Sequence, residues 1–271
     1  MSETETPKLS FSKWLRQPKN MLFLAWWIGG WIVQIALVML KKPWGPDLGV
    51  ASSPIRWMYY YSFSATVTVP SILLMISYCT SLHPEWQAPR GRYIEGQKYP
   101  VLSSYNLVAM AMSAAMFAAA GIFRPAVFDL CAMPAAIGSF YFSPIVGFID
   151  LWIGGALRSI FFGVGLITQQ LPGWGLADGA LWMMSGIVFH LQEDHPMFKN
   201  RIVRLVSLVV FLEVYRYLTL SGPIAFWLNP AEAFWVAFIN FWVVFMPGSV
   251  ISLIAGWIVS EAAIARVKAR S

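Results

Sequence analysis

The chain has 271 residues, of which 58% are hydrophobic and only 12% are charged. A soluble globular chain carries about 25% charged residues, so the composition excludes a soluble domain of any size. The net charge of +6 does not indicate nucleic-acid binding, because most Lys and Arg lie in short connections between apolar runs, where they set membrane topology. The 14 Trp suit a protein with two lipid–water interfaces.

Long unbroken apolar runs predict an all-α, polytopic membrane protein, since a helix needs about 20 apolar residues to span the hydrocarbon core. We expect about eight transmembrane helices, at residues 21–40, 57–80, 103–122, 127–142, 145–167, 175–190, 202–220 and 232–260. The first run is too long for a signal peptide and has no small-residue cleavage site before Lys41, so we expect it to be retained.

The distribution of basic residues predicts the orientation. Lys and Arg concentrate at residues 8–19, 90–98, 199–204 and 266–270, which this scheme places on one side of the membrane. Under the positive-inside rule, both termini are therefore cytoplasmic in a multi-pass protein of the cell membrane. Only the Lys41-Lys42 pair argues against this orientation.

A change of composition near residue 102 predicts two parts. Residues 1–102 form an N-terminal extension with two bulky, aromatic transmembrane helices and a polar cytoplasmic loop at 81–102. Residues 103–271 form a six-helix membrane core, which opens with a helix rich in small residues.

In that helix, Ala111, Ala115 and Ala119 recur every four residues and form one smooth stripe. Small residues let helix backbones approach closely in lipid. The stripe therefore serves either internal packing of the bundle or docking of a separate membrane subunit. Neighbouring Met110, Met112 and Met116 would suit an adaptable partner surface.

The segment after the stripe carries a family resemblance. A short Pro-containing helix is followed by Ser143-Pro-Ile-Val-Gly147-Phe-Ile-Asp150, and Phe245-Met-Pro-Gly-Ser249 lies near the end of the chain. Together with the alanine stripe, this pattern over about residues 103–262 resembles the substrate-binding (S) component of energy-coupling-factor (ECF) vitamin transporters. The resemblance implies a six-helix core whose alanine stripe faces a transmembrane coupling subunit, with transport driven by a partner ATPase.

Ionisable residues within the apolar runs indicate a site or structural ion pairs, because a charge in hydrocarbon is costly. Asp150 and Arg158 share one predicted helix, while Glu213 and Arg216 are one turn apart on another. The two pairs are either mutually neutralising or part of a pocket below the external surface. The residues expected to bind a ligand there are Arg124, Arg158, Glu213, Arg216, Trp174 and Trp227. Three arginines suggest a carboxylate or phosphate on that ligand.

The segment from His190 to His195 offers two imidazoles, but their spacing puts them on different helix faces. We expect a solvated loop there with His190 near the headgroups, and no metal site. The sequence has no phosphate-binding loop, so any ATP use belongs to a partner. It also lacks hydrolase, zinc-protease and haem motifs, so we expect neither an enzyme nor a cofactor.

The sequence therefore predicts a substrate-binding subunit for uptake of a small water-soluble, vitamin-like nutrient. Its partners would be the lipid bilayer, other membrane subunits and a small-molecule ligand. One alternative is a non-catalytic structural subunit of a larger respiratory, photosynthetic or oxygenase complex. A third reading is a lipid-modifying enzyme that uses Asp150 or the His190–His195 segment as acid–base groups.

Overall fold

The computed structural model describes residues 9–39, 54–94, 97, 99–120, 132–163, 167–193, 195–216 and 234–269. In these ranges the chain is helical and contains no strand. Four helices are long and apolar enough to cross a membrane: Pro18–Leu37, Met58–Ser81, Pro144–Phe162 and Pro247–Lys268. The prediction of an all-helical membrane protein is therefore confirmed at this level. The number eight and the orientation of the termini stay predictions.

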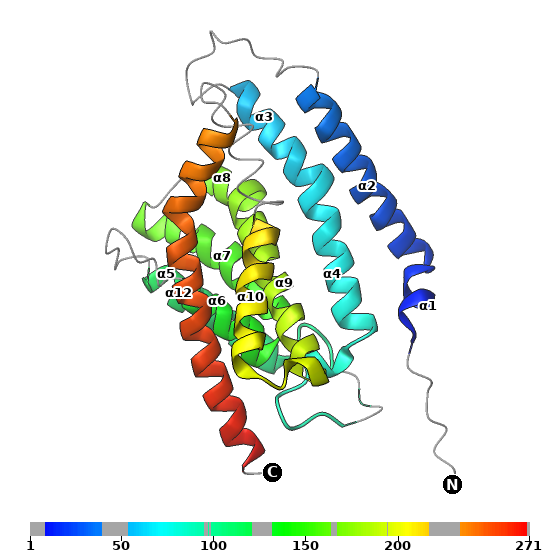
Figure 1. The fold of residues 1–271 in the computed structure, drawn as a ribbon, viewed down its shortest axis with the longest axis vertical. Helices are drawn as coiled ribbons and strands as arrows, with labels where there is room; N and C mark the ends of the chain where they lie inside the picture. The colour runs from blue at the N-terminus through cyan, green and yellow to red at the C-terminus, as the bar shows by residue number, and fades with distance from the viewer. Residues whose placement is uncertain are drawn as a thin grey trace.

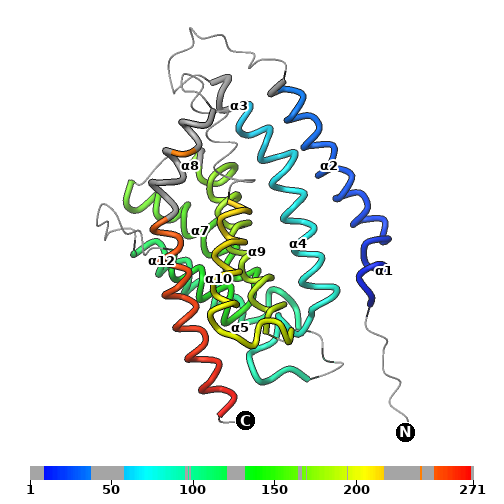
Figure 2. The backbone as a smooth tube through the Cα atoms, viewed as in Figure 1, coloured from blue at the N-terminus to red at the C-terminus, as the bar shows by residue number. Residues whose placement is uncertain are grey.

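The N-terminal part begins with a short helix, α1 (Phe11–Leu15), and a long one, α2 (Pro18–Met39). A second long path follows, made of α3 (Pro54–Phe63), the π-helical turn η1 (Ser64–Thr68) and α4 (Val69–Ser81). Figures 1 and 2 show α2 running beside this path in the opposite direction. The polar segment that follows is not wholly a loop, because it contains the 3₁₀ turn η2 (Pro84–Gln87).

The core elements follow in the order α5 (Ser104–Ala120), α6 (Met133–Ile137), the π turn η4 (Gly138–Phe142) and α7 (Pro144–Phe162). Two short elements, α8 (Ile167–Gln169) and η5 (Gln170–Trp174), occupy the stretch that we expected to be an external loop. They lead into α9 (Gly175–Glu193), the 3₁₀ turn η6 (Pro196–Phe198) and α10 (Arg201–Arg216). The last helix, α12 (Phe234–Lys268), continues through Pro247.

Hydrogen bonds between polar side chains join the N-terminal helices. The Gln34 amide on α2 donates to the hydroxyls of Ser62 and Thr66, at 3.2 Å each. Gly30 lies on the same helix against η1, and a Cβ there would be 2.0 Å from the Thr66 carbonyl oxygen. Small residues and interhelical hydrogen bonds are the main sources of adhesion between helices in lipid, so α2 is held to η1 by both.

Ser143 determines where the chain leaves η4 and begins α7. Its extended backbone ends η4, and its hydroxyl accepts a hydrogen bond from the Ile145 N–H at the start of α7. Pro144 occupies the first turn, where its missing N–H costs nothing. The same hydroxyl donates to Gln87 Oε1 at 3.0 Å, so the segment 84–90 is tied into the core.

The helix α9 lies at the centre of the bundle. Its residues Leu181, Trp182 and Phe189 belong to one buried cluster with α10 and α12. Ala180, Met183 and Ile187 belong to a second cluster with α4 and α7. Since α4 also packs against α9, the N-terminal helices adjoin the core, while the two-part division at residue 102 stays a prediction.

Candidate functional site

Three of the predicted pocket residues are buried inside the helical bundle. Arg158 on α7 is 7% exposed, and Glu213 and Arg216 on α10 are 8% and 4% exposed. Both helices pack against α9. Trp174 lies at the end of η5 and is partly buried. Arg124 and Trp227 lie outside the described residues. The structure therefore describes four of the six residues of the predicted pocket.

Arg216 connects α10 to α12. Its Nη2 atom donates a hydrogen bond to the hydroxyl of Ser249, which follows Pro247 and Gly248 in the last helix. The Nε atom of Arg216 is buried and has no hydrogen-bond partner among the described residues. The guanidinium therefore has donor capacity left after its contact with Ser249.

Arg158 lies over the ring of Phe117 on α5, with its Cζ atom 5.7 Å from the ring centroid. This distance is within the range of a cation–π interaction. The approach of α5 to α7 depends on Gly154, one turn before Arg158, where a Cβ would be 3.0 Å from the Ala114 carbonyl oxygen. The close packing of α5 on α7 thus positions the Arg158 side chain.

Asp150 is fully buried on α7. Neither of its carboxylate oxygens has a hydrogen-bond partner among the described residues. The interpretation of Asp150 and Arg158 as a neutralising pair is not what the structure shows, because eight residues along one helix separate them by about 12 Å. Asp150 is a buried acidic group without the compensating hydrogen bonds that such groups normally have.

The alanine stripe faces outward. Ala111, Ala115 and Ala119 are exposed, whereas Ala114 and Ala118 on the other face of α5 are buried. The small residues that pack internally are therefore a different set from the predicted stripe. Sequence periodicity did not distinguish the two sets, because α5 carries small residues on both faces.

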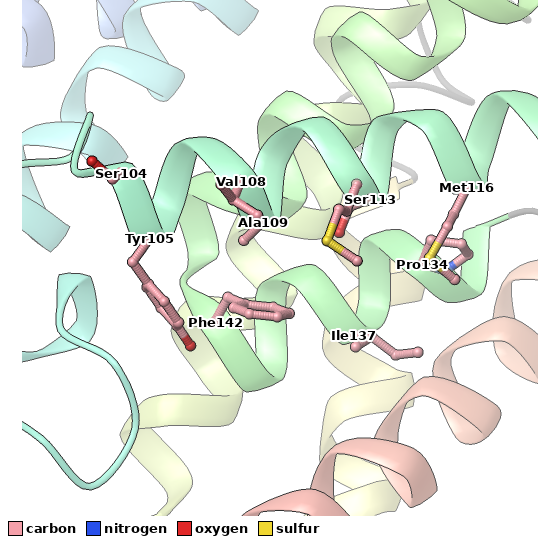
Figure 3. Close-up of a pocket in the computed structure, with 10 residues that line it drawn as sticks. Ser104, Tyr105, Val108, Ala109, Ser113, Met116, Pro134, Ile137 and Phe142 are labelled. Carbon is pink, nitrogen blue, oxygen red and sulfur yellow. The ribbon is translucent and has the colours of Figure 1, made fainter.

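A mostly apolar groove runs beside the stripe, with a volume of about 430 Å³. Figure 3 shows α5 forming one wall, with Phe142, Ile137 and Pro134 of η4 and α6 forming the other. Met112 and Met116, which we expected at a partner surface, line this groove and are 61% and 50% exposed. Met110, by contrast, is buried.

A third group of polar residues, centred on Arg90, was not predicted from the sequence. The Arg90 guanidinium donates to Glu193 Oε2 at 2.6 Å and to the Phe140 carbonyl at 2.7 Å. A third contact joins Arg90 Nη2 to His190 Nδ1 at 3.0 Å. Burial opposes ionisation of the Glu193 carboxyl, but the His190 hydrogen bond and the Arg90 charge outweigh it and lower its pKa to about 2.

The expectation that His190 lies in a solvated loop is wrong. His190 is 3% exposed, and its Nε2 lies 3.2 Å from the Ser139 carbonyl oxygen. Its ring stacks on Trp86 at 5.1 Å between centroids, and Trp86 stacks on His83 at 4.0 Å. Segment 83–90 covers this end of α9, which is why His190 is not in water.

His195 is separate from this group. Its Nδ1 accepts a hydrogen bond from the Met197 N–H and so caps η6. Among the described residues there is no group of three or more His, Cys, Asp or Glu side chains placed to hold a metal ion.

The sequence matches no protein-family model, no curated protein and no solved structure.

Proposed function

We propose that this protein is a membrane-embedded subunit that binds a small, water-soluble, anionic nutrient and takes part in its uptake. In this proposal the bundle crosses the cell membrane about eight times with both termini in the cytoplasm. The buried ionisable residues Arg158, Glu213 and Arg216 form part of the ligand site. Their burial inside the bundle is the observation that supports this function most directly.

Charged side chains within a membrane bundle are costly, and they are retained mostly where they serve substrates, ions or protons. Among the three site residues, Arg158 and Arg216 carry two positive charges against the one negative charge of Glu213. Asp150, the other buried acidic residue of α7, is about two turns away from Arg158. A carboxylate or phosphate on the ligand would match the excess charge of the three, and a guanidinium binds either group through paired N–H donors. The unused Nε donor of Arg216 is consistent with such a contact.

Energy would come from a partner, since the sequence has no phosphate-binding loop. The exposed alanine stripe of α5 is our proposed contact with a membrane coupling subunit. Helices associate in lipid over such small residues, and Ala111, Ala115 and Ala119 are not used inside the described bundle.

Native mass spectrometry of the protein purified from its own membrane tests both parts of the proposal. We expect a bound small anionic molecule and an ATPase module in the same complexes. The variants Arg158→Gln and Arg216→Gln should lose the ligand, whereas Arg201→Gln, at an exposed position, should retain it. Thermal unfolding of each variant separates loss of binding from loss of folding. Ligand retention in both folded variants would show that the arginines are structural.

A matched pair of variants tests the stripe. Ala115→Trp changes an exposed position and Ala114→Trp the adjacent buried one. We expect Ala115→Trp to remain folded and lose the coupling subunit, and Ala114→Trp to destabilise the bundle itself. Unchanged recovery of the subunit with Ala115→Trp would remove the stripe from the interface.

A second candidate function is that of a non-catalytic structural subunit of a larger membrane complex. The helix α2 favours this function. In its most apolar stretch of 18 residues only 17% of the residues are buried, and the exposed ones include Leu22, Ile32 and Ile35. Stoichiometric recovery with a respiratory, photosynthetic or oxygenase complex, without ligand or ATPase, would establish this function in place of uptake.

A further inference from the structure

The groove between α5 and the α6–η4 segment is mostly apolar and has a polar end. We propose that it binds an anionic phospholipid, with one acyl chain along α5 and the phosphate beside Arg92. This inference does not depend on the proposed uptake function, because it concerns a different ligand.

The first support is the size and lining of the groove. Its volume of about 430 Å³ falls within the range of ligand pockets in proteins. Val108, Met112 and Met116, one turn apart on α5, are 58%, 61% and 50% exposed and line it. In a membrane such a surface is in contact with lipid, and flexible methionines adapt to a chain of variable shape.

The second support is the placement of the polar lining residues. Figure 3 shows Ser104 and Tyr105 at one end of the groove, and Met116 and Pro134 at the other. The end at Ser104 is where α5 begins, directly after the polar segment 81–102. This arrangement matches an amphipathic molecule whose headgroup lies at the membrane–water interface.

The third support is charge. Arg90 donates hydrogen bonds to the carbonyls of Phe140 and Tyr141, directly before the groove residue Phe142, and Arg92 follows Arg90 two residues later in the chain. Arg90 is occupied by Glu193 and the Phe140 carbonyl. Arg92 is exposed, and among the described residues no carboxylate forms an ion pair with it. A lipid phosphate at the Tyr105 end would supply that counter-charge.

The groove adjoins the alanine stripe proposed as the coupling interface. Met112 lies three residues before Ala115 and seven before Ala119, so its side chain points within about 60° and about 20° of theirs around the helix. A lipid in the groove and a protein on the stripe would therefore share part of one face of α5, and the retention and cross-linking measurements below distinguish the two occupants.

The number of lipid molecules that the purified protein retains tests this proposal. The purified protein is incubated with mixed micelles of equimolar phosphatidylglycerol and phosphatidylcholine, and retained lipid is counted by native mass spectrometry. We expect one phosphatidylglycerol to be retained preferentially. Met112→Trp, which fills the groove, should lower retention of both lipids several-fold, and Met116→Trp provides a second filled variant. Leu107→Trp is the control, since Leu107 is exposed on α5 but does not line the groove.

A second set of variants tests the contact between the lipid headgroup and Arg92. Arg92→Gln should lower phosphatidylglycerol retention about fivefold, the factor expected for one basic residue beside an anionic lipid, and leave phosphatidylcholine unchanged. Arg201→Gln should change neither. Equal retention of both lipids by the unmodified chain, or equal effects of Met112→Trp and Leu107→Trp, would overturn the proposal. So would cross-linking of position 112 to a protein subunit in native membranes with no lipid retained.

Discussion

Arg90 Nη1 lies 2.6 Å from Glu193 Oε2, although 103 residues separate them in the sequence. The contact joins the segment after α4 to the end of α9, and the same guanidinium bonds the carbonyls of Phe140 and Tyr141 at the end of η4. One side chain thus holds three parts of the chain together.

Removing this side chain should destabilise the protein. Arg90→Ala leaves the Glu193 carboxylate, whose side chain is only 15% exposed, without its cation, at a cost of about 2 kcal/mol. Arg90→Lys should restore only part of the loss, because an ammonium lacks the planar fork that reaches a carboxylate and two carbonyls together. Thermal unfolding in detergent measures both variants. Arg92→Ala, at an exposed position, is the control, and an equal change in that variant would contradict the prediction.

The same contact predicts a dependence of stability on pH. The pKa of Glu193 is lowered in the folded protein from 4.5 to about 2. A lowered pKa contributes stability that is fully present above about 4.5 and is lost as the pH falls toward 2. Unfolding measured between these values should therefore show a loss of stability that is smaller in Glu193→Gln. Identical pH profiles for the two proteins would refute the assignment.

Replacing Asp150 should stabilise the protein, unlike replacing Arg90. Its buried carboxyl has no hydrogen-bond partner among the described residues, so the isosteric Asp150→Asn should stabilise the fold by about 1 kcal/mol. The matched change Asp178→Asn, in the first turn of α9, should not stabilise, since an acidic residue is favourable near a helix N-terminus. Unfolding temperatures compare the two. A folded but inactive Asp150→Asn protein would indicate instead that the carboxyl is retained for function.

The adjacent glycines of α2 form a matched pair. A Cβ at Gly30 would be 2.0 Å from the Thr66 carbonyl oxygen, while a Cβ at Gly29 would meet no atom within 4 Å. Gly30→Ala should therefore separate α2 from η1 and cost about 2 kcal/mol. Gly29→Ala should be neutral or stabilise by up to about 1 kcal/mol through helix propensity. Unfolding of both variants gives the comparison, and a harmless Gly30→Ala would show that α2 is not held there.

The four helices of membrane-spanning length could be predicted from the sequence because apolar length and turn residues are local signals. The expected run at 145–167 corresponds to α7, which begins beside Ser143-Pro144 and ends at Gly163 with φ of +64°. Arg90 and His190 were missed for a physical reason. An arginine in a polar connection resembles any topology-setting cation, and its partners come together only when α4, η4 and α9 pack.

The pocket was harder to predict than the helices. The burial of Arg158, Glu213 and Arg216 agrees with the cost of charge in lipid, but which groups meet depends on helix rotation. Helix rotation also determines which alanines of α5 are buried. Small residues lie on two faces of α5, and the face with Ala114 packs against Gly154 of α7.

The central position of α9 has a consequence for biosynthesis. This helix has 19 residues, as many as α7, yet it is not among the four that are apolar enough to cross a membrane by themselves. Its less apolar surface is covered by α4, α7 and α10 rather than by lipid. We therefore expect α9 to enter the bilayer only together with its neighbours. A nascent chain that stops before α10 would leave it half-covered and open to cellular quality control.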